Sequence, residues 1–266
     1  MSAVASRPLR TPLQVTLAVW KALFLREAVA RLSRERLAWL WVLAEPVGHI
    51  CILVAIRIVI RQRTIAGADA TLFFVLGVLA FFLPRNMILR SFDAVGQNTQ
   101  LYAHRQVKPI DTVLTRAAVE GVISALLFAV LLSGLALLGV DVVPDDPMGV
   151  LAALAALWTA GLGLGLVNSV VGEMLPMLAR VLRVMLTPLY ILSGVMYPTL
   201  ILPHPWRDWL LYNPLVHGVE AMRAAYMQGY HVPPSIDLSY TVAFGVAAMF
   251  FGLALHLRFQ GRLIAR

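Results

Sequence analysis

Six stretches of the chain are apolar enough and long enough to cross a membrane as helices. They are residues 37–60, 70–90, 111–139, 150–172, 177–198 and 238–257. A helix needs about 20 mostly apolar residues to span the hydrocarbon core of a bilayer. The polar pieces between these stretches are too short to fold as separate domains. We therefore predict an all-α membrane protein with six transmembrane helices.

The N-terminal arm, residues 1–36, carries a different pattern. Its apolar side chains at helical spacing are Leu13, Leu17, Trp20 and Phe24. Side chains three and four residues apart share one face of a helix, so we predict an amphipathic helix. Such a helix lies in the cytoplasmic headgroup layer or packs against a partner protein, and the pattern leaves both open. Residues 37–266 then form one transmembrane domain.

Residues 198–237 contain six of the fifteen prolines and only short apolar runs. Aromatic residues that favour the lipid interface lie among these runs: Trp206, Trp209, Tyr212, Tyr226 and Tyr230. We interpret the segment as one or two short re-entrant helices that dip into the outer leaflet between spans 5 and 6. The alternative is a partly ordered external loop.

Composition and charge agree with a membrane location. Of the 266 residues, 60% are hydrophobic and 14% charged, and the mean hydropathy is +0.79. With the N-terminus inside, 17 Lys and Arg lie on the cytoplasmic side against 4 outside. This bias follows the positive-inside rule and predicts a multi-pass membrane protein with both termini cytoplasmic. The net charge of +8 therefore does not require nucleic acid as a partner.

The first span contains polar residues that a lipid-facing helix would not tolerate. Those at steps of four or eight along one row are Trp41, Glu45, His49 and Arg57, with the helix-kinking Pro46 beside them. Ionisable residues within a membrane usually face a protein interior or a watery cavity. These residues therefore line a pathway through the protein, or they pair with Arg85 or Arg90 of the second span in a buried site. Neither reading excludes the other.

Other residues are weaker candidates for a functional site. Phe74 and Phe81 share one face of the second span, where aromatic rings stack on sugars or, more often, pack in the core. Glu220 and Arg223 are spaced as an i, i+3 ion pair in the re-entrant segment. The GLGLG run at 161–165 is followed by no lysine and lies within a span, where small residues allow close helix approach.

Motifs for catalysis and nucleotide binding are missing from the chain. It contains no GxxxxGK[ST], HExxH or GxSxG sequence and no clustered Cys and His residues. We therefore predict a chain that is not an enzyme and binds no cofactor or metal itself.

Three stretches carry a resemblance to a known family. RERLAWLWVLAEP, QVKPIDTVLTRAAVEG and SGVMYPTLILPHPWRDWLLYNPLVHGVEAMRAAY resemble the membrane subunits of ABC-2 type exporters, in particular the capsular polysaccharide export permeases of Gram-negative bacteria. The resemblance implies a homodimer in the bacterial inner membrane that works with two ATPase subunits, which bind ATP and magnesium. It also implies a lipid-linked acidic polysaccharide as substrate, passed to a periplasmic copolymerase and an outer-membrane exporter.

The resemblance also implies that the N-terminal helix and the loop after the second span contact the ATPase. The residues assigned to this coupling are Trp20, Phe24, Asn98, Tyr102, Gln106, Lys108 and Pro109. The residues predicted to line or attract the substrate are Trp41, His49, Arg57, Phe74, Phe81, Arg85, Arg90, Tyr190 and Tyr197. Because Glu45 would repel an acidic chain, we expect it to be structural and paired with an arginine, and Pro46 to shape the path.

Three other functions compete with this one. A permease for O-antigen or teichoic acid would share the same architecture. An ion-coupled secondary transporter would use the charges of the first span as a proton relay, but the chain lacks matching broken segments in two halves. An intramembrane transferase would need a nucleophile or metal set, which the sequence does not contain.

Overall fold

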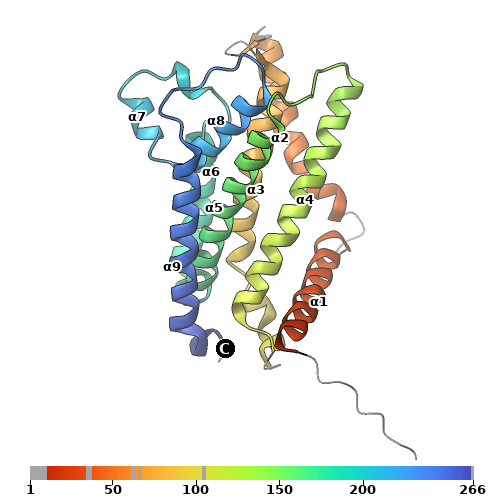
Figure 1. The fold of residues 1–266 in the computed structure, drawn as a ribbon, viewed down its shortest axis with the longest axis vertical. Coiled ribbons are helices and arrows are strands. Elements are labelled where there is room, and N and C mark those ends of the chain that lie inside the picture. The colour runs from red at the N-terminus through yellow and green to blue at the C-terminus, as the bar shows by residue number, and fades with distance from the viewer. Residues whose placement is uncertain (1–10, 34–37, 61–63, 66–67, 104–105, 265–266) are drawn as a thin grey trace, which may run out of the picture.

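The computed structural model describes residues 11–33, 38–60, 64–65, 68–103 and 106–264. This part of the chain is a bundle of helices that run side by side (Figure 1). Its α-helices are α1 (Pro12–Ser33), α2 (Ala38–Ile60), α3 (Ala70–Ser91), α4 (Pro109–Leu137), α5 (Pro147–Met174), α6 (Pro176–Leu192), α7 (Trp206–Leu210), α8 (Pro214–Tyr226) and α9 (Leu238–Ile264). The connections contain the 3-10 helices η1 (Gly96–Ala103) and η2 (Thr199–Ile201) and a short antiparallel hairpin of β1 (Thr64–Ile65) and β2 (Ala68–Asp69).

The two ends of the bundle differ (Figure 1). At one end, α1 lies alongside the first half of α4, near the C-terminal end of α9. At the opposite end lie α7, the outer part of α8 and the connection between α4 and α5. We call these the α1 end and the α7 end. The predicted topology places the α1 end in the cytoplasm.

The prediction of an all-helical membrane protein is confirmed, and that of six spans is supported in part. Four helices, α3, α4, α5 and α9, are long and apolar enough to cross a membrane. Each begins and ends within a few residues of its predicted boundary, except that α9 extends beyond residue 257. The helices α2 and α6 coincide with the other two predicted spans but are shorter in their described apolar parts. Their crossing of the membrane remains a prediction.

Side-chain caps and prolines explain where several helices begin. Asp69 accepts a hydrogen bond from the backbone N–H of Leu72 at the start of α3. Asp146 accepts from two backbone N–H groups at the start of α5, and Asn213 accepts from one at the start of α8. Proline occupies the first turn of α4, α5 and α8, where a missing N–H leaves no bond unmade.

Helix α3 lies at the centre of the bundle, in contact with α2, α4, α5 and α8. Phe73, Leu76 and Phe81 are fully buried there. A span surrounded by protein exposes little of its surface to lipid, which explains why α3 is apolar on every face rather than on one stripe.

Helix α5 packs between α3 and α9, and glycines make this close approach possible. A Cβ added to Gly161 would lie 2.8 Å from the Cα of Pro84 in α3. A Cβ added to Gly163 would lie 2.5 Å from the carbonyl oxygen of Gly245 in α9. Both distances are too short for real atoms, so the GLGLG run serves helix packing, as its position within a span indicates.

The predicted N-terminal helix is present as α1, but its apolar stripe is divided. Leu13 and Leu17 are exposed, whereas the Trp20 side chain reaches α4 and Phe24 packs against the core. Part of the stripe therefore contacts this chain rather than lipid. Between spans 5 and 6 the structure contains the expected short helices, α7 and α8, and their dip into a membrane remains a prediction.

Candidate transport path and coupling surface

Polar side chains of α2 and α3 meet on one face of the bundle. The Arg85 guanidinium lies 2.7 Å from the Glu45 carboxylate, so one of the two pairings left open by the sequence is present. The Glu45 side chain is 41% exposed and that of Arg85 is 22% exposed. Arg85 also lies over the Phe82 ring, 4.8 Å from its centroid. This ion pair is therefore partly exposed on the surface of the bundle.

His49 extends this face toward α6. Its ring centroid lies 5.2 Å from that of Phe82 and 5.8 Å from that of Tyr190, both at steep angles. Tyr190 in turn packs edge-on against the buried Phe81, at 5.4 Å. We call Glu45, His49, Phe82, Arg85 and Tyr190 the path cluster.

The path cluster combines the two kinds of group that an acidic polysaccharide needs. Aromatic rings can stack on sugar faces, and an arginine can bind a carboxylate or phosphate through two parallel hydrogen bonds. His49 and Glu45 are exposed although they belong to an apolar helix. In a bilayer such groups face water or a second protein surface, because exposure to hydrocarbon is costly.

The remaining residues predicted for the path lie elsewhere. Phe74 and Phe81 are buried in the core, as is Phe82 of the path cluster, and this position favours packing over contact with a substrate in this conformation. Trp41 is 69% exposed on α2. The Tyr197 hydroxyl donates to the Ile191 carbonyl at the end of α6. The side chain of Arg57 lies outside the described part of the structure, and Arg90 belongs to a separate cluster at the α1 end.

The residues assigned to ATPase coupling gather at the α1 end. The Trp20 indole donates to Asp111 at 2.8 Å, and the backbone N–H of Lys108 donates to the other oxygen of the same carboxylate. Arg26 of α1 donates to Asn98 of η1. Helix α1 is therefore joined to η1 and to the start of α4 by polar contacts.

The other coupling residues complete the same surface. Tyr102 is buried, and its hydroxyl lies 3.1 Å from the Thr112 hydroxyl. Burial raises the pKa of the Tyr102 phenol to about 12, so it remains protonated at neutral pH. Pro109 is buried at the start of α4, whereas Gln106 and Lys108 are exposed. These exposed side chains are accessible to a partner.

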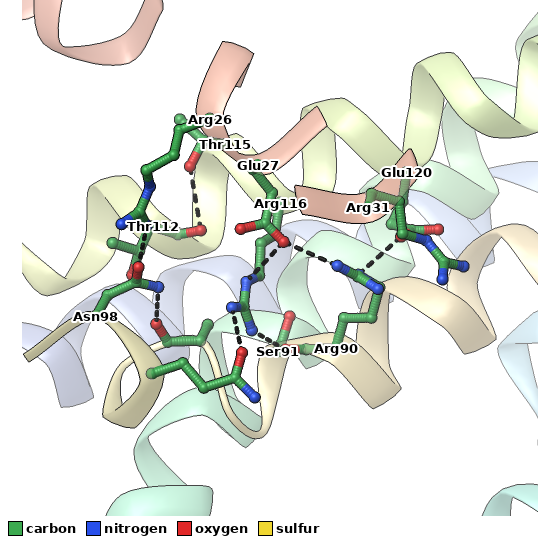
Figure 2. Close-up of polar contacts among 12 residues, drawn as sticks. Arg26, Glu27, Arg31, Arg90, Ser91, Asn98, Thr112, Thr115, Arg116 and Glu120 are labelled. Carbon is green, nitrogen blue, oxygen red and sulfur yellow. Dashed lines mark hydrogen bonds and ion pairs between the residues drawn. The ribbon is translucent and has the colours of Figure 1, made fainter. Parts of the chain in front are cut away.

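A cluster of five charged residues lies beneath this surface (Figure 2). We call Glu27, Arg31, Arg90, Arg116 and Glu120 the α1 charge cluster. Arg90 contacts Glu27 and Glu120, each at 2.8 Å. Arg116 lies 3.2 Å from Glu27, and Arg31 lies 3.3 Å from Glu120. Three guanidiniums against two carboxylates leave a net charge of +1.

The cluster joins three helices and η1. Glu27 and Arg31 come from α1, Arg90 from α3, and the other two from α4. Arg116 also donates to the Arg90 carbonyl and to Gln97 of η1, each at 2.8 Å. Glu120 is 1% exposed. A carboxylate this deeply buried is stabilised only by charged partners close to it.

Sequence reasoning found one member of this cluster, Arg90, and assigned it to the path. Glu120 and Arg116 lie in the stretch QVKPIDTVLTRAAVEG, but the sequence alone predicted no function for them. The signal was available, because Arg116 and Glu120 are four residues apart and share one face of a predicted membrane helix, as do Glu27 and Arg31 on α1. Only the packing of α1 against α4 shows that the two pairs meet.

Glu220 and Arg223 form the predicted ion pair, at 3.4 Å, with both side chains fully buried. The pair has further partners at the α7 end. The Tyr230 hydroxyl donates to Glu220 at 2.8 Å, and the Thr199 backbone N–H donates to the same carboxylate at 3.3 Å. Arg223 donates to backbone carbonyls of α3 and of the segment after α6. This network reaches well beyond an i, i+3 pair.

Within the described residues, no three His, Cys, Asp or Glu side chains gather as a metal site. A buried histidine, His256 of α9, instead shares a hydrogen bond of 2.9 Å with the Ser169 hydroxyl of α5. Such a contact satisfies two polar groups between packed spans. Its geometry matches a structural role.

Comparison with known proteins agrees with this architecture. The sequence matches the ABC-2 type transporter family over residues 18–227. It is 34% identical over 247 residues to the polysialic acid transport protein KpsM of Escherichia coli, covering 93% of this chain and 95% of KpsM. It is 27% identical to the capsule polysaccharide export inner-membrane protein CtrC of Neisseria meningitidis, covering 90% of each chain.

A third relative is the capsule polysaccharide export inner-membrane protein BexB of Haemophilus influenzae. It is 24% identical over 242 residues, covering 91% of each chain. The match to the family covers most of this sequence, and the spans α3, α4 and α5 lie entirely within it. This protein belongs to the ABC-2 type transporter family.

Proposed function

We propose that this protein is the permease subunit of an ATP-driven exporter that moves lipid-linked acidic capsular polysaccharide out of the cytoplasm. The names of KpsM, CtrC and BexB support the substrate class. The observation that carries the proposal is the path cluster. It places an exposed histidine and a partly exposed arginine on otherwise apolar helices, beside the half-buried ring of Tyr190 and the buried ring of Phe82.

The chain works in this proposal as a homodimer of six-span subunits. A hydrophilic polymer cannot cross through lipid, so two copies must enclose a water-accessible path. Helices α2 and α6 carry the path cluster together with α3 and would line that path. The exposed Glu45 and His49 then face water or the second copy, which removes the cost of exposing them to hydrocarbon.

ATP hydrolysis belongs to a separate pair of ATPase subunits in this proposal. The chain has no phosphate-binding loop, and its two lysines, Lys21 and Lys108, lie in no such motif. The exposed side chains of Gln106 and Lys108 and the adjoining α1 offer the contact surface at the cytoplasmic end. A periplasmic copolymerase and an outer-membrane exporter receive the polymer, and both termini of this chain remain in the cytoplasm.

The test is reconstitution of the protein in lipid vesicles with its ATPase partner. We expect stable co-purification and an ATPase rate that rises when lipid-linked capsular polysaccharide is added. The matched controls are the same lipid end without polymer and vesicles that contain the ATPase alone. If no ATPase binds and the purified chain moves a solute down a proton gradient, the protein is a secondary transporter and the proposal is wrong.

A further inference from the structure

Helix α6 ends early, and the carbonyl groups of the turn that follows it need donors. The helix contains 17 residues, which span about 26 Å and fall short of the roughly 30 Å hydrocarbon core. The chain leaves the helix through Gly194, whose φ of +68° an L side chain rarely adopts. Carbonyls in such a turn have no partner within the helix and, in a bilayer, no water.

Side chains of the external segment supply these donors. Arg223 of α8 donates through Nη1 to the Gly194 carbonyl at 2.7 Å and through Nη2 to the Val195 carbonyl at 2.8 Å. The side-chain amide of Asn213 donates to the Leu192 carbonyl at 3.1 Å. A cation at a helix C-terminus also opposes the negative end of the helix dipole. Asn213 therefore caps α6 itself, and Arg223 holds the turn that directly follows it.

The guanidinium is itself held against α3. Its Nε donates to the Phe73 carbonyl at 3.3 Å, and its carbon lies 3.6 Å from the centroid of the Phe73 ring. A Cβ at Gly77 would lie 2.0 Å from Nη2, so only glycine leaves room at that position. Glu220 balances the charge. Arg223 is 0% exposed and joins the turn after α6 to α3 through backbone carbonyls and the Phe73 ring.

The helix that precedes this turn also carries one residue of the path cluster. Tyr190 lies on the last turn of α6, against His49 and Phe81. We propose that Arg223 is a positioning residue for transport, which sets the outer end of α6 and thereby the place of Tyr190 in the path. The inference rests on the export function proposed above. It assigns to Arg223 a role that its pairing with Glu220 alone would not give it.

Lysine cannot take over this role. The planar guanidinium donates in three directions from three nitrogens, whereas an ammonium is a compact charge with one nitrogen. Arg223→Lys therefore retains the ion pair with Glu220 but loses carbonyl contacts at the end of α6. A role limited to charge balance predicts that Arg223→Lys restores transport, and the positioning role predicts that it does not.

The experiment measures the accessibility of the end of α6. Ser193 is fully buried directly after that helix, so Ser193→Cys in a Cys51→Ser background gives one thiol in the chain to label. The complex in vesicles is treated from outside with a membrane-impermeant maleimide. The variants added are Arg223→Lys and Arg223→Gln. The matched control is His256→Leu, which breaks a buried polar contact between α5 and α9 away from α6.

We expect the two Arg223 variants to label at least tenfold faster than the parent and to transport at least tenfold less polymer. His256→Leu should label at the parent rate. Slow labelling with transport near the parent level in Arg223→Lys would overturn the inference, as would equal labelling in His256→Leu. If Arg223→Gln does not assemble, Arg223→Lys decides. Absence of transport in the parent complex would refute the export function, while the labelling rates would still decide whether Arg223 holds α6.

Discussion

Arginines with buried partners are stabilised in different ways at the two ends of the bundle. At the α1 end, Arg31, Arg90 and Arg116 lie among the carboxylates of Glu27 and Glu120. At the α7 end, Arg223 contacts one carboxylate and three backbone carbonyls. The first arrangement depends on side-chain charges, and the second depends on the path of the backbone.

This difference bears on what each end can do. Carboxylates and guanidiniums on separate helices can part and pair again when one helix moves, and the arginines of the α1 charge cluster other than Arg116 remain partly exposed. The carbonyls that Arg223 contacts belong to the backbone of α3 and of the turn after α6, so they cannot exchange partners unless that backbone moves. We therefore interpret the α1 end as suited to movement and the α7 end as suited to holding the path in shape.

The largest effect is expected at the α1 end. Glu120→Ala removes a fully buried carboxylate and raises the net charge of its cluster from +1 to +2. Removal of one partner from a buried ion pair destabilises a protein by roughly 3–5 kcal/mol. The measurement is the free energy of unfolding in detergent, with the exposed Asp145→Ala as control. A loss as small as that of the control would show that solvent already screens the cluster.

A smaller loss is expected when Gly77 is replaced by alanine. The new methyl group would overlap the Arg223 guanidinium, and overpacking of a core typically costs about 1–3 kcal/mol. Gly134→Ala in α4 is the matched control, because nothing lies within 4 Å of its added Cβ. Thermal unfolding of both variants tests the difference. Equal midpoints would mean that the guanidinium moves freely, contrary to its contacts with backbone.

Tyr230→Phe should weaken the α7 end by about 1.5 kcal/mol, the lower value for a hydrogen bond to a charged group. It removes only the hydroxyl that donates to Glu220, and the carboxylate retains Arg223 and the Thr199 N–H. The matched control is Tyr240→Phe, whose hydroxyl donates to a carbonyl in an exposed contact. Unfolding free energies of the two variants are compared. A loss above about 3 kcal/mol for Tyr230→Phe would show that the hydroxyl stabilises the protein by more than its single hydrogen bond to Glu220 explains.

The smallest effect on stability is expected between the two ends, in the path cluster. Glu45→Gln breaks a partly exposed ion pair worth about 0–1 kcal/mol and leaves a side chain of the same shape. Transport in vesicles should be retained, since we assign Glu45 to bracing rather than to substrate contact. Loss of transport with dimer assembly and ATPase coupling intact would show that the carboxylate acts in the path itself. Arg85→Gln, by comparison, should reduce transport.

The sequence by itself determined the class of protein and the approximate helix boundaries. A long apolar run forms a helix in a bilayer, because every backbone N–H and C=O must be paired within the segment. The α3, α4 and α5 boundaries therefore fell within a few residues of their predicted positions. The position of the GLGLG run within a span also predicted that its glycines allow close packing of helices.

Tertiary structure decided which charges meet. Arg85 and Arg90 are five residues apart on α3, yet Arg85 pairs with Glu45 and Arg90 joins Glu27 and Glu120. Positions five residues apart point in different directions around a helix, so the choice of partner depends on which helices pack on each side. The backbone partners of Arg223 depend likewise on where α6 ends beside α8. Contacts between residues far apart in the sequence leave no pattern in the sequence around either residue, because only the packing of the helices brings them together.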